Sequence, residues 1–134
     1  MLLQPKKFNY KKIQKNRLSK FKFKSNKLIF GSIGLKAAES GTISAKQIEA
    51  ARQAISRKLK RKGKIWIRIF PFLPITKKPA EVRMGKGKGS IKYWSIKIRG
   101  GTILFELCGI PYQNAVIAFK TGGAKLPIKT FVYV

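Results

Sequence analysis

The sequence predicts an α+β fold in which two helices cover one face of a mostly antiparallel sheet. Three observations lead to this class. Apolar residues recur at helical spacing in two stretches, they alternate or run together in shorter stretches, and glycine and proline separate these stretches. The expected order is strand, helix, strand, long loop, two strands, helix and strand. The 134 residues are typical of one domain.

The first strand and the first helix are expected within residues 28–62. Residues 28–38 predict a strand interrupted by two glycines, which indicate a bulge or a close backbone approach. Ser44 and Gln47 have the spacing of a capping box, so a helix begins there and continues to about Lys62. Its buried stripe is predicted to consist of Ile48, Ala51, Ile55 and Leu59.

The middle of the chain predicts two strands on either side of a long loop. Residues 65–70 form the first of them, and three of the six prolines then stiffen a connector over residues 71–79. The connector and the glycine–lysine stretch after it make one inserted loop, residues 71–92. Residues 93–98 predict the next strand. Its inward side chains are Trp94, Ile96 and Ile98, and its outward side chains are Ser95 and Lys97.

The last third predicts a hairpin, a helix and a final strand. Residues 102–107 follow a glycine pair and complete a hairpin with the preceding strand. Pro111 suits the first turn of a helix, and Pro127 lies beyond its end. Residues 128–134 predict the last strand. The expected inward residues are Ile103, Phe105 and Leu107 in the strand and Ala115, Ile117, Ala118 and Phe119 in the helix.

The charge of the chain is strongly one-sided. Lysine and arginine number 31 against four glutamates, which gives a formal net charge of +27. Such a domain repels itself when free, so the composition predicts a polyanionic partner, with nucleic acid first and an anionic membrane as the rival. No apolar run is long enough to span a membrane, and the basic N-terminus lacks the apolar core of a secretory signal.

The residue types that most enzymes and metal sites need are missing or few. The chain has no histidine, no aspartate and a single cysteine, Cys108. These counts exclude an internal disulfide and an ordinary zinc site, and general acid–base catalysis is hard to assemble from four scattered glutamates. The sequence predicts a protein that is not an enzyme and uses no cofactor or metal.

Residues 1–27 form a basic extension without an acidic residue, followed by the single domain of residues 28–134. Charge runs of this kind are commonly solvated tails. Four aromatic residues are interleaved with the lysines, namely Phe8, Tyr10, Phe21 and Phe23. Aromatic rings stack on exposed bases while lysines neutralise phosphates, so the extension is expected to fold onto RNA.

The stretch from Arg83 to Ser90 alternates glycine with lysine, which no packed element favours. It lacks the GxxxxGK[S/T] spacing of a P-loop, and its third glycine comes one residue early for GxGxxG. Two interpretations of the stretch remain: a hairpin tip with no role in binding, and a contact with nucleic-acid phosphates. The overall charge favours the contact.

Most of the residues expected to bind RNA are basic, and they come from four parts of the chain. Lysine and arginine at the end of the first helix also suit the helix dipole, so a purely structural role for them stays open. The full set is Lys6, Lys7, Lys11, Lys12, Arg17, Arg57, Lys60, Arg61, Lys64, Arg68, Lys77, Lys78, Arg83, Met84, Gly85, Lys86, Gly87, Lys88 and Gly89.

Collinear runs along the whole chain resemble those of one known family. Examples are residues 1–6 (MLLQPK), 30–37 (FGSIGLKA), 47–52 (QIEAAR), 63–71 (GKIWIRIFP), 83–89 (RMGKGKG) and 125–130 (KLPIKT). On these runs the chain resembles the bacterial-type L16 (uL16) family of large-ribosomal-subunit proteins. The poorest match is over residues 9–27, and Phe72 stands where the family often has aspartate.

The resemblance implies an α/β sandwich of the L16 type that binds large-subunit rRNA near the A-site and the central cavity. It implies late entry into the assembling subunit, neighbouring ribosomal proteins, and no catalysis, membrane or small-molecule substrate. The loop at residues 83–89 is expected to point toward the A-site tRNA. The alternative to this ribosomal role is a free, basic nucleic-acid-binding module.

Enrichment in lysine, isoleucine and phenylalanine suggests an A+T-rich genome of the kind that organelles often have. The family match begins at Met1, which leaves no room for a transit peptide and favours an organelle-encoded product. The expected compartment is the mitochondrion, with a plastid or the bacterial cytoplasm as alternatives.

Overall fold

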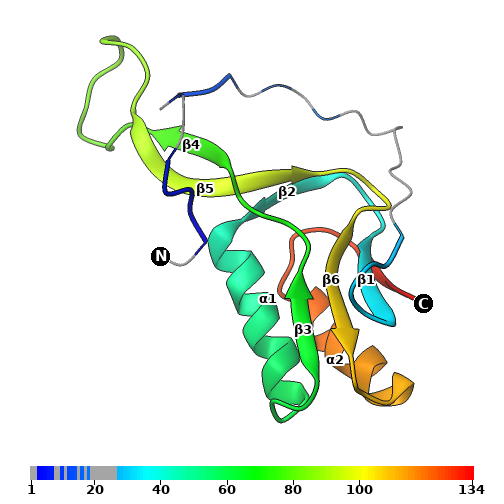
Figure 1. Cartoon of the computed structure of the whole chain (residues 1–134). Coiled ribbons are helices and arrows are strands. Elements are labelled where there is room, and N and C mark those ends of the chain that lie inside the picture. Colours follow the sequence, from blue (N-terminus) through cyan, green and yellow to red (C-terminus); the bar gives the residue numbers. More distant parts are fainter. Residues whose placement is uncertain (1–2, 8–9, 11, 15, 17, 19–26) are drawn as a thin grey trace.

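The protein, as seen in a computed structural model, consists of two antiparallel sheets and two helices (Figure 1). The structure describes residues 3–7, 10, 12–14, 16, 18 and 27–134. The four-stranded sheet, in the order β3-β6-β1-β7, contains β1 (Ile33–Ala37), β3 (Lys64–Ile67), β6 (Ile103–Cys108) and β7 (Thr130–Tyr133). The three-stranded sheet, in the order β2-β5-β4, contains β2 (Gly41–Ser44), β4 (Leu73–Lys77) and β5 (Ser90–Ile98). The helices are α1 (Ala45–Lys58) and α2 (Tyr112–Gly123).

The predicted α+β class with two helices is confirmed, but the strands divide into two sheets. The expected hairpin of residues 93–98 and 102–107 is wrong, because β5 pairs with β2 and β4 while β6 pairs with β1 and β3. The turn between them leads from one sheet to the other. Gly101 has a φ of 82°, and its N–H donates to the carbonyl oxygen of Ala37 over 2.7 Å. This bond fixes the chain at the step between the sheets.

Helix α1 begins at the predicted capping box. The Ser44 hydroxyl accepts a hydrogen bond from the Gln47 N–H over 3.4 Å, and Gln47 Oε1 accepts one from the Ser44 N–H over 2.8 Å. The predicted stripe is confirmed, since Ile48, Ala51, Ile55 and Leu59 are all buried. The helix ends at Lys58 rather than near Lys62. The shortening arises because Lys60 and Arg61 have positive φ values, 51° and 63°, which turn the chain back toward β3.

The core lies between the two helices and the four-stranded sheet. Helix α1 contacts β3, helix α2 contacts β1 and β7, and the helices pack against each other. A Cβ at Gly122 would lie 2.4 Å from Ile55 Cγ1, so glycine permits this close helix contact. Ala115, Ala118 and Phe119 are buried as predicted, but the expected burial of Ile117 is wrong. Ile117 is two positions from both Ala115 and Phe119, which places it on the opposite side of the helix.

Two strands were not expected from the sequence, β2 and β4. Strand β4 lies inside the predicted inserted loop of residues 71–92 and includes Pro74. Proline is tolerated there because β4 is an edge strand of the β2-β5-β4 sheet. The predicted outward position of Ser95 is also wrong. Ser95 lies opposite Ser44 and Leu73 in the central strand of that sheet, where it is fully buried and its hydroxyl donates to the Leu73 carbonyl oxygen over 3.4 Å.

Candidate nucleic-acid interface

The glycine–lysine loop connects β4 to β5 and comprises residues 78–89. Figure 1 shows it projecting beyond these two strands, away from both helices. The side chains of Arg83, Met84, Lys86 and Lys88 are exposed, and Met84 is 99% exposed. The loop therefore presents its charges to its surroundings and does not pack them against the domain.

The loop glycines have two different structural roles. Gly85, Lys86 and Gly87 have φ values of 100°, 54° and 78°, and a Cβ at either glycine would meet no atom within 4 Å. These glycines serve the backbone turn and leave the main chain accessible. A Cβ at Gly89 would lie 2.7 Å from the carbonyl oxygen of Lys77. Glycine is needed at that position because the two stems of the loop approach closely.

The N-terminal extension is bonded to the loop. Lys12 Nζ donates to the Lys88 carbonyl oxygen over 2.6 Å, and Lys88 Nζ donates to the Ile13 carbonyl oxygen over 2.6 Å. Lys78 Nζ donates to the Gly85 carbonyl oxygen within the loop. Lys12, Ile13 and residues 78–89 thus form one surface, which we call the loop–extension surface.

The other predicted binding residues of the extension and of β4 are only partly described. Lys6 and Lys7 are exposed, and Lys77 is exposed at the end of β4. The predicted binding residues Lys11 and Arg17, together with Phe8, Phe21 and Phe23, lie outside the described residues.

Arg57, Lys60, Arg61 and Lys64 form a second basic group, which we call the helix-end surface. All four are exposed, at the end of α1 and the start of β3. Figure 1 places this end of α1 at the bottom of the molecule and the loop at the top, so the two surfaces are far apart. The predicted residues therefore belong to two separate basic surfaces. Arg57 and Arg61 line a hollow of about 330 Å³ on the helix-end surface.

Arg68 lies in neither basic surface. It follows β3, its side chain is only 18% exposed, and its guanidinium forms an ion pair with the fully buried carboxylate of Glu106 in β6. The guanidinium also lies 5.2 Å from the centre of the Phe30 ring, which stacks on Trp66. Arg68 is therefore held by the domain, in contrast to the exposed lysines of the loop.

Glu106 fixes the point at which the extension joins the domain. Its carboxylate accepts hydrogen bonds from the backbone N–H groups of Phe30 and Gly31, over 2.7 and 2.8 Å, and from that of Ile29 over 3.3 Å. Burial raises the pKa of the Glu106 carboxyl, but these backbone bonds and the bond from Arg68 outweigh burial and hold the pKa below its ordinary value. We call Glu106, Arg68 and residues 29–31 the Glu106 clamp.

Sequence reasoning missed Glu106. The signal was present, since a lone glutamate stands among apolar residues in β6 and a lone arginine stands among apolar residues in residues 65–70. Alternation assigned Glu106 to the outward face, but Leu104 and Glu106 are as fully buried as Phe105 between them. Both faces of β6 are covered, so a charge on either face needs a partner.

The described residues show neither a membrane span nor a metal cluster. Within them, no helix has the length and apolar character that crossing a membrane requires. Histidine, cysteine, aspartate and glutamate side chains do not gather in groups of three or more anywhere in the same residues.

Exposed basic surfaces on a rigid α+β platform, in a chain of net charge +27, are typical of basic nucleic-acid-binding proteins. A family model described as Ribosomal protein L16p/L10e matches residues 5–133, and the chain belongs to this family. The family is one of ribosomal proteins and not one of enzymes.

Relatives of high identity come from several bacteria, and each bears the name Large ribosomal subunit protein uL16. The relative from Sphingopyxis alaskensis is 55% identical over 131 residues, which cover 98% of this chain and 92% of the relative. The relative from Blochmanniella pennsylvanica is 55% identical over 97% of this chain and 96% of its own length. The relative from Borrelia hermsii is 50% identical over 96% and 94%.

Proposed function

We propose that this chain is a structural component of the large ribosomal subunit, where it binds large-subunit rRNA and neighbouring ribosomal proteins. The observation that carries the proposal is the identity of up to 55%, over nearly the whole chain, to proteins that bear that name. The loop–extension surface and the helix-end surface support it, because contacts with phosphates supply much of the affinity of a protein for RNA. The chain contributes a scaffold and electrostatic neutralisation.

The lysines of the loop–extension surface are suited to this role. Lys12 and Lys88 each donate to a backbone carbonyl oxygen of the other segment, which holds the two segments together. An ammonium group has three donors, so each lysine keeps donors for phosphate oxygens. The loop and the extension therefore approach RNA as one unit.

Sedimentation of cell extracts through a sucrose gradient tests the proposal. We expect the chain in the large-subunit peak, and in the complete ribosomes that contain that subunit. High salt should release it, because phosphate contacts weaken as salt rises. Absence of the chain from the large-subunit peak at low salt would overturn the proposal and favour a free nucleic-acid-binding module.

We also propose that the chain joins the subunit late in assembly, near the A-site and the central cavity, and that the loop lies close to the A-site tRNA. The exposure of the loop and its left-handed turn at residues 85–87 support this placement, because the main chain can approach a ligand closely there. A cleavage reagent can be attached at position 84 in a Met84→Cys, Cys108→Ser variant. Cleavage of tRNA bound in the A-site is expected. Cleavage of rRNA alone would remove the tRNA contact and leave the subunit role in place.

We propose further that the ribosome concerned is mitochondrial. The support is compositional, namely the enrichment in lysine, isoleucine and phenylalanine. The relatives named above are bacterial, so this step reaches beyond them. The chain should sediment with the large subunit from purified mitochondria, and its recovery from plastids or from a bacterial cytosol instead would reject the compartment.

The chain is proposed to divide into an RNA-binding extension, residues 1–27, and a domain that folds without it, residues 28–134. The shortened chain should keep a cooperative unfolding transition but bind RNA with a smaller salt dependence, because it lacks the basic residues of the extension. Loss of the transition would mean that the extension is part of the domain.

A further inference from the structure

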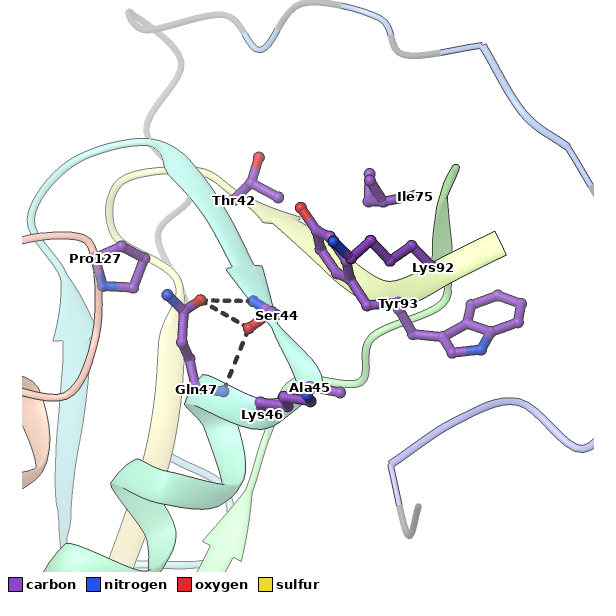
Figure 2. Close-up of a pocket in the computed structure, with 10 residues that line it drawn as sticks. Thr42, Ser44, Ala45, Lys46, Gln47, Ile75, Lys92, Tyr93 and Pro127 are labelled. Atoms are coloured by element: carbon purple, nitrogen blue, oxygen red, sulfur yellow. Dashed lines mark hydrogen bonds between the residues drawn. The ribbon is translucent and has the colours of Figure 1, made fainter. Parts of the chain in front are cut away.

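A hollow of about 380 Å³ lies outside both basic surfaces, between the start of α1 and the three-stranded sheet. Figure 2 shows the side chains around it, which come from β2, the first turn of α1, β4, β5 and, with Pro127, the segment that precedes β7. The volume lies within the range of about 300–1,000 Å³ that is common for sites of small ligands. The hollow is large enough for a single ring system with its substituents.

One wall of the hollow is aromatic and apolar. Tyr93 of β5 is 38% exposed, and the next residue, Trp94, is buried and also lines the hollow. Ile75 of β4 lies directly opposite Tyr93 in the strand register. Tyr93 and Ile75 both line the hollow, so a flat ligand meets an aromatic ring and an aliphatic side chain there.

The polar groups that a ligand meets are neutral or positively charged. Ser44 and Gln47 border the hollow, but they are bonded to each other in the capping box that Figure 2 shows. Thr42, Lys46 and Lys92 are exposed at the border. Among the described residues that line the hollow, none is acidic. The site therefore favours a ligand that combines a flat ring with negative charge.

We propose that this hollow binds one unstacked base of a single-stranded RNA segment. The base stacks on the ring of Tyr93, the phosphates on either side of it contact Lys46 and Lys92, and the Thr42 hydroxyl faces the nucleotide. A base within a duplex cannot enter, because it is already stacked and paired, whereas bases of loops and bulges can be splayed onto aromatic side chains. This inference rests on the proposed function, since it assumes that the partner is RNA.

A second hollow shows where the RNA strand continues. It has a volume of about 470 Å³, shares residues 92–94 with the first hollow, and is lined on its other side by Gln4, Pro5 and Lys6. Lys6 was predicted to bind RNA and is exposed. The strand that leaves Tyr93 thus enters a neighbouring depression with a further lysine, and Lys92 lies where the two hollows meet.

Binding of a short single-stranded oligoribonucleotide to the full chain tests the inference, with a duplex of the same sequence for comparison. The measurement is made at raised salt, which weakens phosphate contacts but not stacking. We expect Tyr93→Ile to weaken single-strand binding by about 5- to 140-fold, the change that corresponds to stacking energies of about 1–3 kcal/mol. Isoleucine suits a strand but has no ring. Tyr93→Phe keeps the ring and should bind like the original chain.

A matched control is Tyr112→Ile, because Tyr112 is an exposed tyrosine on α2 outside the hollow, and this variant should bind normally. With 4-thiouridine in the oligonucleotide, cross-links should map to Tyr93 and its neighbours. Equal binding by Tyr93→Ile and the original chain, or equal affinity for duplex and single strand, overturns the inference. If those results come with normal sedimentation in the large-subunit peak, only the base pocket fails and the proposed function stands.

Discussion

The Glu106 clamp and the tip of the glycine–lysine loop both combine glycine with charge, but they use them in opposite ways. In the clamp, a Cβ at Gly31 would lie 2.6 Å from the Leu107 carbonyl oxygen, and the charges of Glu106 and Arg68 neutralise each other. At the tip, a Cβ at Gly87 would meet no atom within 4 Å, and Lys86 is exposed. Glycine permits close packing in the first region and a left-handed turn in the second.

The difference shows how to separate charges that serve the fold from charges that are available to a partner. Glu106 is the single buried acidic residue among the described residues of a chain with four glutamates. Loss of its carboxylate leaves the Arg68 guanidinium and the backbone N–H groups that donate to it without their acceptor. Lys86 and Lys88 at the tip have no such dependence, because both side chains are exposed and Lys88 bonds only to a backbone carbonyl oxygen of the extension. Substitutions in the clamp should therefore change stability, and substitutions at the tip should change RNA binding.

The largest expected effect on stability is that of Glu106→Gln. This change leaves Arg68 without its carboxylate and replaces an acceptor of several hydrogen bonds by an amide of the same shape. We expect the free energy of unfolding to fall by about 3–5 kcal/mol, as when one partner of a buried ion pair is removed. Unfolding by urea, followed by circular dichroism, measures it.

Glu81→Gln is the matched control for this prediction. Glu81 is exposed in the loop, so the same change of charge and shape should alter the free energy of unfolding by less than about 0.5 kcal/mol. If both variants lose the same small amount, the clamp does not stabilise the domain.

The clamp should also make stability depend on pH in the acid range. The pKa of Glu106 is lowered in the folded chain from an ordinary value of 4.5, so the unfolded chain takes up the proton first as the pH falls. The contribution of Glu106 is therefore complete above pH 4.5 and is lost below it, with a slope of at most about 1.4 kcal/mol per pH unit. The stability of the Glu106→Gln variant does not show this loss, because glutamine takes up no proton in this range. Its difference from the original chain should shrink as the pH is lowered, and a constant difference would contradict the assignment.

Much of the fold was predictable because its elements carry local signals. The capping box of Ser44 and Gln47 and the stripe of Ile48 and Ile55 depend on residues three to seven positions apart, and the structure confirms both. The separation into two sheets was not predictable from local patterns. It depends on the pairing of β5 with β2, across about 50 residues of chain, and alternation within β5 does not specify a partner.

The candidate site was predictable in composition but not in arrangement. The sequence identified Lys12 and Lys88, whereas only the structure shows that they bond to each other's segments. The sequence also grouped Arg68 with the binding residues, because sequence alone does not show whether a carboxylate lies beside an arginine in the folded chain. Glu106 and the hollow beside Tyr93 were missed for a related reason. Their surroundings come from strands that are distant in sequence.

A smaller effect is expected from placing the same methyl group in each of the two regions. Gly31→Ala drives a Cβ against the backbone of Leu107, so the free energy of unfolding should fall by about 1–3 kcal/mol. The methyl group of Gly87→Ala meets no atoms. The free energy of unfolding should therefore fall only by the cost of holding alanine in a left-handed backbone conformation, roughly 1 kcal/mol. Gly87→Asn should cost less than Gly87→Ala, because asparagine tolerates positive φ. Thermal unfolding of the three variants gives the order, and a greater loss for Gly87→Ala than for Gly31→Ala would reverse the comparison.

The smallest effect on stability, and the largest on RNA, is expected from Lys86→Glu combined with Lys88→Glu. Both side chains are exposed, and the Lys88 bond to the Ile13 carbonyl oxygen that is lost is also exposed, so the free energy of unfolding should change by less than about 0.5 kcal/mol. Affinity for rRNA should fall, and the slope of log K against log salt should decrease by about 0.7–0.9 for each phosphate that the variant no longer neutralises. Lys120→Glu with Lys125→Glu changes the net charge equally on exposed residues at the end of α2. If this control weakens binding as much as the loop variant does, RNA responds to total charge alone and the loop is not a specific contact.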